Sequence, residues 1–280
     1  MRDELFKVLA VADAHNTICA MDKDGVLAEV IPQVRVMRHV QQGGYHHLDV
    51  WKHSLEALKK LEALFVALKD DSDVTVYLGE TFAGDRPRLS LMKLAALLHD
   101  IGKPQPHAGK NGKTMFHGHE RIGRVISKAV AERLKLSTRE RFALDTIIFW
   151  HLRPGYLADL KILTERAVHR YFRDTKEEAA SVLLVAIADQ RATRGPMTTP
   201  ASHRRHDRVS LALLKRYFEK LKEKPFVRLI SGDDLIKKLK LTPGPSFSKI
   251  LYAVEEAQVE GKIKTKAQAL AWAKKVSKKV

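Results

Sequence analysis

The stretch LMKLAALLHDIGK, residues 91–103, joins an apolar helical repeat to a histidine and an aspartate. Its apolar residues recur at spacings of three and four, which predicts a helix from Leu89 to His99. Gly102 then ends that helix. Adjacent side chains diverge by about 100° in mid-helix, but both can approach one point below the last turn. His99 and Asp100 are therefore candidate ligands of one metal ion.

Other histidines and an aspartate stand at or near the ends of further apolar, helical segments: His53, His119, His151 and Asp189. Asp189 follows seven apolar residues, and a carboxylate buried there is costly unless a cation or hydrogen-bond donors accompany it. Imidazole nitrogens and carboxylate oxygens are the usual ligands of borderline divalent metals. The set predicts a metal site, although core histidines and a helix-terminal aspartate with ordinary hydrogen bonds would give the same pattern.

Helical periodicity extends through nearly the whole chain, and sustained β alternation is absent. The expected helices span 51–69, 89–99, 120–134, 138–150, 163–172, 177–189 and 203–222. The predicted fold class is all-α, a helical bundle with a small helical C-terminal tail. We expect three parts: a short helical segment over 1–45, a main domain over 46–222, and a basic helical tail over 223–280.

Composition narrows the class of protein further. The chain has 280 residues, of which 45% are hydrophobic, enough for a real core. Its single cysteine, Cys19, excludes an intramolecular disulfide framework and a cysteine-rich zinc site, which favours a cytoplasmic protein. Asp3 and Glu4 interrupt any leader at once, and the longest apolar runs are too short to span a bilayer. We expect no membrane partner.

The net charge of +17 favours polyanionic partners such as nucleotides or RNA. A basic, well-solvated surface of a thermostable protein would carry the same charge. Residues 231–280 contain eleven lysines, no arginine and five acidic residues. This segment is either a surface that faces a polyanion, which allows tRNA contact, or a solvated helical cap.

Two motifs resemble nucleotide-chemistry signatures without their context. Asp22-Lys23-Asp24-Gly25 lacks a glycine-rich partner and a following parallel sheet, so we interpret it as a turn or helix cap. Residues 109–114, GKNGKT, end like a phosphate-binding loop, but His107 occupies the position of the required first glycine and no strand precedes it. We expect a Gly- and Lys-rich loop that skirts the metal site.

The order His53, then His99-Asp100, then Asp189 resembles the H…HD…D pattern of the HD-domain superfamily of metal-dependent phosphohydrolases. Further motifs resemble, more specifically, the C-terminal HD and body region of the bacterial tRNA nucleotidyltransferase/poly(A) polymerase family. They are YHHLDVW (45–51), FHGHE (116–120), HLRP (151–154), ISGDDL (230–235), TPGP (242–245) and EAQVEG (256–261). The resemblance covers roughly residues 30–275. The Gly-Ser and paired-aspartate motifs of the family's nucleotidyltransferase head are missing, so we do not expect nucleotidyl transfer by this chain alone.

The resemblance implies one or two divalent ions. His119 and His151 match the positions that hold a second ion in binuclear HD proteins, in which the doublet aspartate, here Asp100, bridges the two. Mixed His/Asp ligation leaves Mn, Mg, Co, Ni, Fe and Zn open. We expect His46 and His47 to support the site or to have a structural role rather than to bind metal, and His117 either to support the site or to lie on the surface.

Catalytic and phosphate-binding roles fall on residues near these ligands. Lys103 is the best candidate for a phosphate anchor, with Arg153 and Arg191 as weaker ones. Glu120 is expected to orient water or a ligand, or else to be an ordinary exposed helical glutamate. Asp100 is expected to act in catalysis through the metal.

The sequence thus predicts a metal-dependent phosphohydrolase, a phosphodiesterase or phosphatase that acts on nucleotides or RNA 3′ ends with metal-activated water. The alternative is an RNA- or tRNA-binding body module that works with a separate catalytic head. The full ligand set favours the hydrolase.

Overall fold

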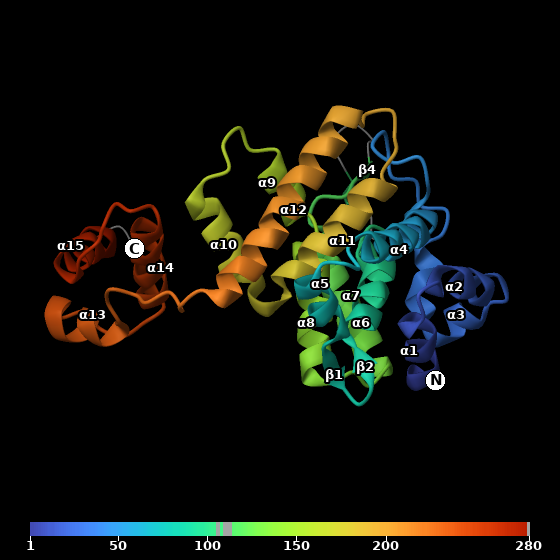
Figure 1. Ribbon diagram of the computed structural model, residues 1–280, viewed down its shortest axis with the longest axis horizontal. Helices are drawn as coiled ribbons and strands as arrows, with labels where there is room; N and C mark the ends of the chain where they lie inside the picture. The colour runs from blue at the N-terminus through green and yellow to red at the C-terminus, as the bar shows by residue number, and fades with distance from the viewer. Residues whose placement is uncertain (105–106, 109–113, 279–280) are drawn as a thin grey trace. The chain divides into compact units, whose positions relative to one another are not determined.

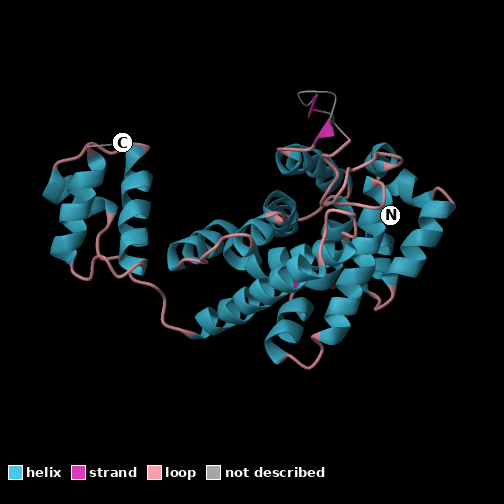
Figure 2. Cartoon of the chain, turned by 90° about the horizontal axis from the view of Figure 1, so that it is seen from above, coloured by secondary structure: helices cyan, strands magenta, loops and turns pink. Residues whose placement is uncertain are grey.

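The protein is helical throughout most of the chain, in a computed structural model that describes residues 1–104, 107–108 and 114–278 (Figures 1 and 2). The first helices are α1 (Arg2–Ala10), α2 (Ala14–Lys23), α3 (Val26–Val30), η1 (Pro32–Met37), α4 (Val50–Ala67), α5 (Ser72–Gly79), α6 (Arg88–Leu98), α7 (His119–Arg133) and α8 (Thr138–Trp150). They are followed by α9 (Arg153–Ala158), α10 (Glu165–Thr175), η3 (Lys176–Glu178), α11 (Ala179–Ala192), α12 (Pro200–Lys222), α13 (Gly232–Leu239), α14 (Ser246–Val259) and α15 (Lys266–Ser277). The expected all-α class is confirmed.

Among the described residues, four short strands interrupt the helices, and no pattern in the sequence predicts them. They form two antiparallel pairs: β1 (Thr81–Ala83) with β2 (Arg86–Pro87), and β3 (His107–Ala108) with β4 (Thr114–Met115). Strands of two or three residues are too short for an alternating pattern to be visible. The phosphate-loop-like residues 109–113 lie outside the described part of the chain.

The chain divides into two compact units. Unit 1 comprises Met1–Leu160 and Thr175–Phe218, and unit 2 comprises Lys161–Asp174 and Glu219–Val280. The expected division into 1–45, 46–222 and 223–280 stays a prediction, because close packing does not measure which segments fold independently. Among the described helices, none combines the length and apolar character that crossing a membrane requires.

Unit 1 is built around α11, whose residues 179–188 are almost entirely buried. This helix packs along α4 and also contacts α6 and α8, while α7 packs on α8. A helix that is apolar on all sides must be covered on all sides, which explains its central position. The flanking helices have local start signals: Asp49 caps α4 by accepting from the Lys52 N–H at 2.9 Å, and Ser137 begins α8 in a capping box.

A buried charge pair holds the N-terminal helices against the rest of unit 1. Lys93 on α6 is 1% exposed and its ammonium lies 2.7 Å from a carboxylate oxygen of Glu62 on α4. The same carboxylate accepts from the backbone N–H groups of Ala14 and His15, and Lys93 also donates to the carbonyl of Val11. Complete pairing is what makes such buried charges tolerable. The motif at 22–25 forms the last two residues of α2 and the turn that follows, with Gly25 at φ +77°, which agrees with the turn or helix cap expected from the sequence.

Unit 2 has its own hydrophobic core, formed by α13, α14, α15 and the segments between them: Ile230, Leu235, Ile250, Val254, Ala257, Ile263, Ala269 and Ala273. Helix α10 is joined to α14 by ion pairs, because three arginines, Arg166, Arg170 and Arg173, surround the buried carboxylate of Glu256. His169 lies 2.8 Å from the neighbouring Glu255. These charges act within the unit and stabilise the attachment of α10.

Gly102 has a packing role beyond that of a helix terminator. A Cβ at this position would collide with the backbone carbonyl of His119 and lie 2.5 Å from the amide nitrogen of Gly123. The turn after α6 and the first turn of α7 therefore touch backbone to backbone. Only glycine permits this approach, which brings the segment 99–100 next to His119.

We expect Gly102→Ala to lower the free energy of unfolding by about 2–3 kcal/mol, because backbone must move to admit the methyl group. For a protein of this size that corresponds to a fall in Tm of roughly 4–12 °C. Thermal unfolding followed by circular dichroism measures it. Gly79→Ala is the matched control, since nothing lies within 4 Å of a Cβ there. Equal Tm values for the two variants would contradict the packing role of Gly102.

Candidate metal centre

The six predicted metal ligands come from separate helices of unit 1. His53 lies in the first turn of α4, His99 and Asp100 follow α6, and Asp189 lies in the last turns of α11. The remaining two also sit at helix ends, since His119 begins α7 and His151 follows α8. The sequence indicated that Asp189 ends its helix, but α11 continues to Ala192. The apolar run ends at Asp189 because one face becomes polar, not because the helix stops.

The structure brings His53, His99, Asp100 and Asp189 together. The Nε2 atom of His53 is 2.8 Å from Oδ1 of Asp189 and 3.7 Å from Oδ2 of Asp100. The Nε2 atom of His99 is 3.2 Å from the same Oδ2 of Asp100 and 3.6 Å from Oδ1 of Asp189. Two imidazole nitrogens and two carboxylate oxygens thus face one another.

A second group lies on the other oxygen of Asp100. Its Oδ1 atom is 3.1 Å from Nε2 of His119 and 3.7 Å from Nε2 of His151, and those two nitrogens are 3.3 Å apart. Each group, His53–His99–Asp100 and Asp100–His119–His151, is buried and has ligand-type atoms within 4.8 Å of one another. Asp100 belongs to both groups, and each of its two oxygens faces a different pair of histidines.

Backbone carbonyls orient three of the four histidines. The Nδ1 atoms of His99, His119 and His151 lie 2.7–2.8 Å from the carbonyls of Ala96, Phe116 and Ile148, each three residues earlier. A carbonyl accepts only, so each Nδ1 carries a proton and each Nε2 faces an oxygen of Asp100. This second hydrogen bond is the arrangement that metal-binding histidines use. Nε2 of His99 is buried, and the described groups nearest to it are the carboxylate oxygens of Asp100 and Asp189, at 3.2 and 3.6 Å, neither in good hydrogen-bond geometry.

The charges around the centre also suit a cation. Burial raises the pKa of Asp100, but the nearby Lys103 and His99 outweigh it and hold that pKa well below its usual range. Burial likewise opposes ionisation of Asp189, whereas hydrogen bonds from His53 and His99 keep its pKa well below the usual value. Burial, with the charges of His99 and His119, lowers the pKa of His151 to about 3. The centre therefore holds two carboxylates and a neutral imidazole.

The His99 imidazole has the opposite shift. Burial lowers its pKa, but Asp100 and Asp189 act more strongly in the other direction and raise the pKa to about 10. A proton on this ring balances the two buried carboxylates. A metal ion at this position would replace that proton.

Lys103 lies beside the centre, and its ammonium group already donates two hydrogen bonds. It donates to Oδ2 of Asp100 at 2.6 Å and to Oε1 of Gln42 at 2.7 Å, and the residue is 7% exposed. In this geometry it positions the Asp100 carboxylate. The predicted role of Lys103 as a phosphate anchor stays a prediction. An ammonium group has three N–H donors, and these two bonds leave one for a phosphate oxygen.

A loop before α4 covers the centre, and a close backbone contact holds that loop. The N–H of Gly195 donates to the carbonyl of Tyr45 at 2.7 Å, and the N–H of Met197 donates to the carbonyl of Gly44 at 3.0 Å. A Cβ on Gly195 would collide with this loop. His46 consequently packs edge-on against the His53 ring, with centroids 4.6 Å apart. Burial and the charges of Lys103 and His53 lower the pKa of His46 to about 3.

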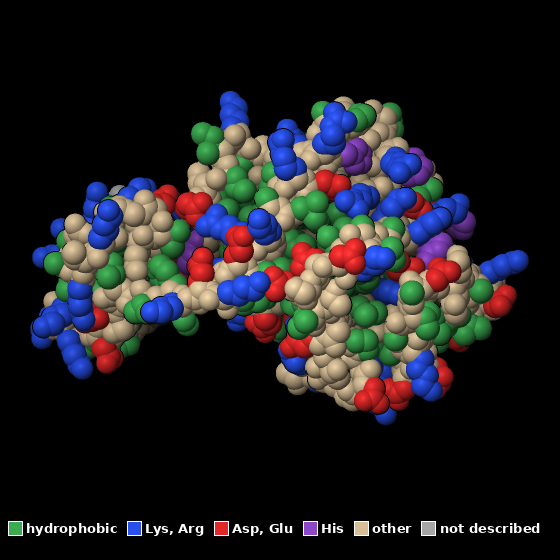
Figure 3. Space-filling model, viewed as in Figure 1, with side chains coloured by type: hydrophobic (Ala, Val, Ile, Leu, Met, Phe, Trp, Pro, Cys, Tyr) green, Lys and Arg blue, Asp and Glu red, His purple; other side chains and the backbone are tan. Residues whose placement is uncertain are grey.

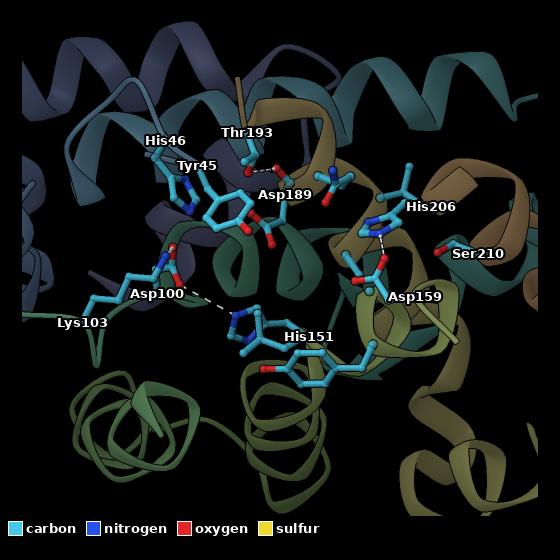
Figure 4. A pocket seen from close by; sticks show the side chains of 16 residues that line it. Tyr45, His46, Asp100, Lys103, His151, Asp159, Asp189, Thr193, His206 and Ser210 are labelled. Atoms are coloured by element: carbon cyan, nitrogen blue, oxygen red, sulfur yellow. Dashed lines mark hydrogen bonds and ion pairs between the residues drawn. The ribbon is translucent and has the colours of Figure 1, made fainter. Parts of the chain in front are cut away.

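A pocket of about 300 Å³ opens onto the centre (Figure 4). Asp100, Lys103, His151 and Asp189 contribute to its wall. The rest of the wall includes residues that the sequence did not single out for this site, namely Tyr45, Tyr156, Asp159, Gln190, Thr193, His206 and Ser210. His206 lines this pocket, and its Nε2 lies 3.1 Å from Oδ1 of Asp159. Its position one turn before Ser210 on α12 gave no periodic signal that could have revealed this.

The other residues that were predicted to act on or bind substrate do not line this pocket. Glu120 lines an adjoining pocket of about 420 Å³ together with His119 and Lys103. Arg191 pairs with Asp207 at 2.9 Å and lines a different pocket, so the structure does not bring it to the metal centre. Arg153 begins α9 and is not among the residues of the pocket wall. The phosphate-binding roles of these arginines remain predictions.

The chain was compared with known families and curated proteins. Residues 50–194 match the HD domain, and residues 202–273 match the putative tRNA nucleotidyltransferase domain 2. The ligand-bearing helices from α4 to α11 all lie within the first match.

Two relatives are similar over nearly the whole chain. The A-adding tRNA nucleotidyltransferase of Deinococcus radiodurans is 30% identical over 97% of this chain and 57% of its own length. The CC-adding tRNA nucleotidyltransferase of Thermus thermophilus is 27% identical over 97% of this chain and 55% of its own length. A bifunctional uridylyltransferase/uridylyl-removing enzyme of Hydrogenovibrio crunogenus is 24% identical over 60% of this chain and 18% of its own length.

The chain thus spans about half the length of the two tRNA nucleotidyltransferases that it matches most extensively. The resemblance seen in the sequence is confirmed for the HD domain and for the C-terminal region related to tRNA nucleotidyltransferases. This chain belongs to the HD-domain family, and it joins its HD domain to a tRNA nucleotidyltransferase domain 2.

Proposed function

We propose that the chain is a metal-dependent phosphohydrolase with a binuclear centre. The observation that carries this proposal is the Asp100 carboxylate, whose Oδ2 faces His53 and His99 and whose Oδ1 faces His119 and His151. Asp100 would hold one ion together with His53 and His99 and a second together with His119 and His151. Asp189, beside His53, would add a ligand for the first ion.

A pair of divalent ions held there would supply a water molecule of lowered pKa and neutralise charge on the phosphoryl oxygens. The chain's own groups prepare the site for that chemistry. Lys103 and Gln42 fix the rotation of the Asp100 carboxylate. Backbone carbonyls keep three histidine rings in the tautomer that presents Nε2.

The size of the pocket limits which substrates it can hold. Tyr45 and the pair of His206 with Asp159 line the pocket from different elements (Figure 4). Tyr156 also belongs to its wall. A volume of about 300 Å³ fits a phosphoryl group and the sugar attached to it better than a folded macromolecule. We therefore propose nucleotides or RNA 3′ ends as substrates of phosphodiester or phosphomonoester hydrolysis.

A second candidate function is a tRNA-binding body that works with a separate nucleotidyltransferase head. The match of residues 202–273 to tRNA nucleotidyltransferase domain 2 favours it, as do the two relatives that transfer nucleotides to tRNA. The two functions are compatible, because the metal centre lies in unit 1 and the lysine-rich segment lies in unit 2.

Metal content tests the centre directly. After loading with Mn, Co, Ni or Zn and removal of excess metal, elemental analysis is expected to find two ions per chain. His53→Ala and His151→Ala each remove a ligand from one group, so each is expected to lose one ion, with affinity at that position lowered at least about 100-fold. His117→Ala is the control, because His117 is an exposed neighbour of His119 outside both groups. A wild-type chain without stoichiometric metal would refute the proposal.

Hydrolysis tests the chemistry. Metal-loaded protein is expected to cleave bis-p-nitrophenyl phosphate and 2′,3′-cyclic nucleotides. Asp100→Asn keeps the side-chain shape but removes the bridging charge, so kcat is expected to fall by roughly 1,000-fold or more. His117→Ala is expected to keep the wild-type rate. Loaded wild-type protein that turns over none of these substrates with any of the metals would count against hydrolysis.

Gel shifts with tRNA over a salt series test the second candidate. Binding is expected to weaken steeply as salt rises, because lysines release counterions from the phosphates. The double variant Lys237→Glu and Lys238→Glu, in exposed positions on α13, is expected to bind more weakly, whereas Asp100→Asn is not. A weak interaction that salt does not change would argue against a tRNA-binding body.

A further inference from the structure

A second pocket of unit 1 is lined by cations and lies where α11 ends and α12 begins. Its volume is about 570 Å³, and its wall includes Lys60, Arg191, Arg194, His203 and Arg204. Figure 3 shows Lys, Arg and His side chains gathered over the end of the molecule where α12 starts. No carboxylate is among the described residues of this wall.

Among the described residues, two of these cationic side chains lie close to a carboxylate and two do not. Lys60 lies 3.0 Å from Glu56, and Arg191 lies 2.9 Å from Asp207. In the part of the chain that the structure describes, no carboxylate pairs with the exposed Arg194 or Arg204. The pocket therefore has a net positive charge and free guanidinium donors, which attract an anion.

The start of α12 adds further donors. Thr199 precedes the helix, and its hydroxyl oxygen accepts from the N–H of Ser202 at 3.1 Å. Its hydroxyl proton has no acceptor among the described residues, so it is available to a bound oxygen. The 23-residue helix also directs the positive end of its dipole toward the pocket.

This pocket is separate from the metal centre. Asp189 faces the centre, and Arg191 stands two residues later on α11, about 200° around the helix. The two pockets have no wall residue in common among those described. They adjoin through one pair, since Nε2 of Gln190 in the metal pocket lies 3.4 Å from Nδ1 of His203 in the cationic pocket.

We propose that the cationic pocket binds the phosphoryl group of a compact phosphorylated ligand, independently of the metal centre. Planar guanidinium groups match two phosphate oxygens at once, and Arg194 and Arg204 are free to do so. The ligand is compact because the charged residues surround one pocket of small-molecule size. The inference goes beyond the proposed hydrolysis, since this site holds a phosphate without cleaving it.

Isothermal titration at low ionic strength, without added metal, tests the proposal with two probes, inorganic pyrophosphate and a nucleoside 5′-diphosphate. The wild-type chain is expected to bind at least one of them. Arg194→Ala and Arg204→Ala are each expected to weaken binding roughly tenfold, because each removes a charge-assisted contact from an exposed position. Arg121→Ala removes the same charge from the exposed surface of α7 and is expected to change nothing.

Asp100→Asn separates this site from the metal centre. It is expected to bind pyrophosphate as the wild type does, even if it loses every hydrolytic activity. Three results would each overturn the proposal: no binding of either probe by the wild-type chain, binding by Arg194→Ala and Arg204→Ala as tight as that of the wild type, or loss of binding in Asp100→Asn. So would an arginine-dependent preference for an RNA oligonucleotide over both compact anions.

Discussion

The buried Asp100 carboxylate imposes the main constraint on this fold. It is 1% exposed, and a charge removed from water to that extent must be surrounded by partners. Lys103 and four histidines from different helices provide them. Each partner stands at or near a helix end, so the positions of α4, α6, α7 and α8 are coupled through one side chain. Close backbone contacts at Gly102 and Gly195 then set those helix ends and the covering loop at the required distance.

Most of the helices and of the candidate metal ligands could be predicted from the sequence, because the patterns that indicate them are local. Apolar spacing predicts the helices, and α8 coincides with the expected 138–150. The histidine–aspartate doublet and the carboxylate after an apolar run stand out because both are costly to bury. Those arguments identify Asp100 and Asp189 without any knowledge of the tertiary structure. The order of His119 and His151 along the chain had meaning only through resemblance to a family.

The sequence could not place residues that reach the centre through tertiary packing. Gln42 holds Lys103 from a loop that lies 61 positions earlier, and the pair of His206 with Asp159 joins α12 to the end of α9. No periodicity links such residues. Arg191 was expected near phosphate because it follows Asp189 closely. The helix continues, however, and turns Arg191 toward the opposite side. Since α11 does not end where its apolar run ends, nearness to Asp189 in the sequence does not by itself place Arg191 at the centre.

The distribution of charge explains why metal and substrate are linked in the proposed hydrolase. The described wall of the metal pocket contains three carboxylates, Asp100, Asp159 and Asp189, against one lysine whose amine is already paired. A phosphate that approaches these groups alone meets repulsion, and only added cations reverse the sign of the field. The cationic pocket beyond α11 has the opposite character and needs no metal to attract an anion. Helix α11 thus separates an anion site that depends on metal from one that does not. Anion binding in the metal pocket must follow the metal content of the protein. Anion binding in the cationic pocket must follow the ionic strength.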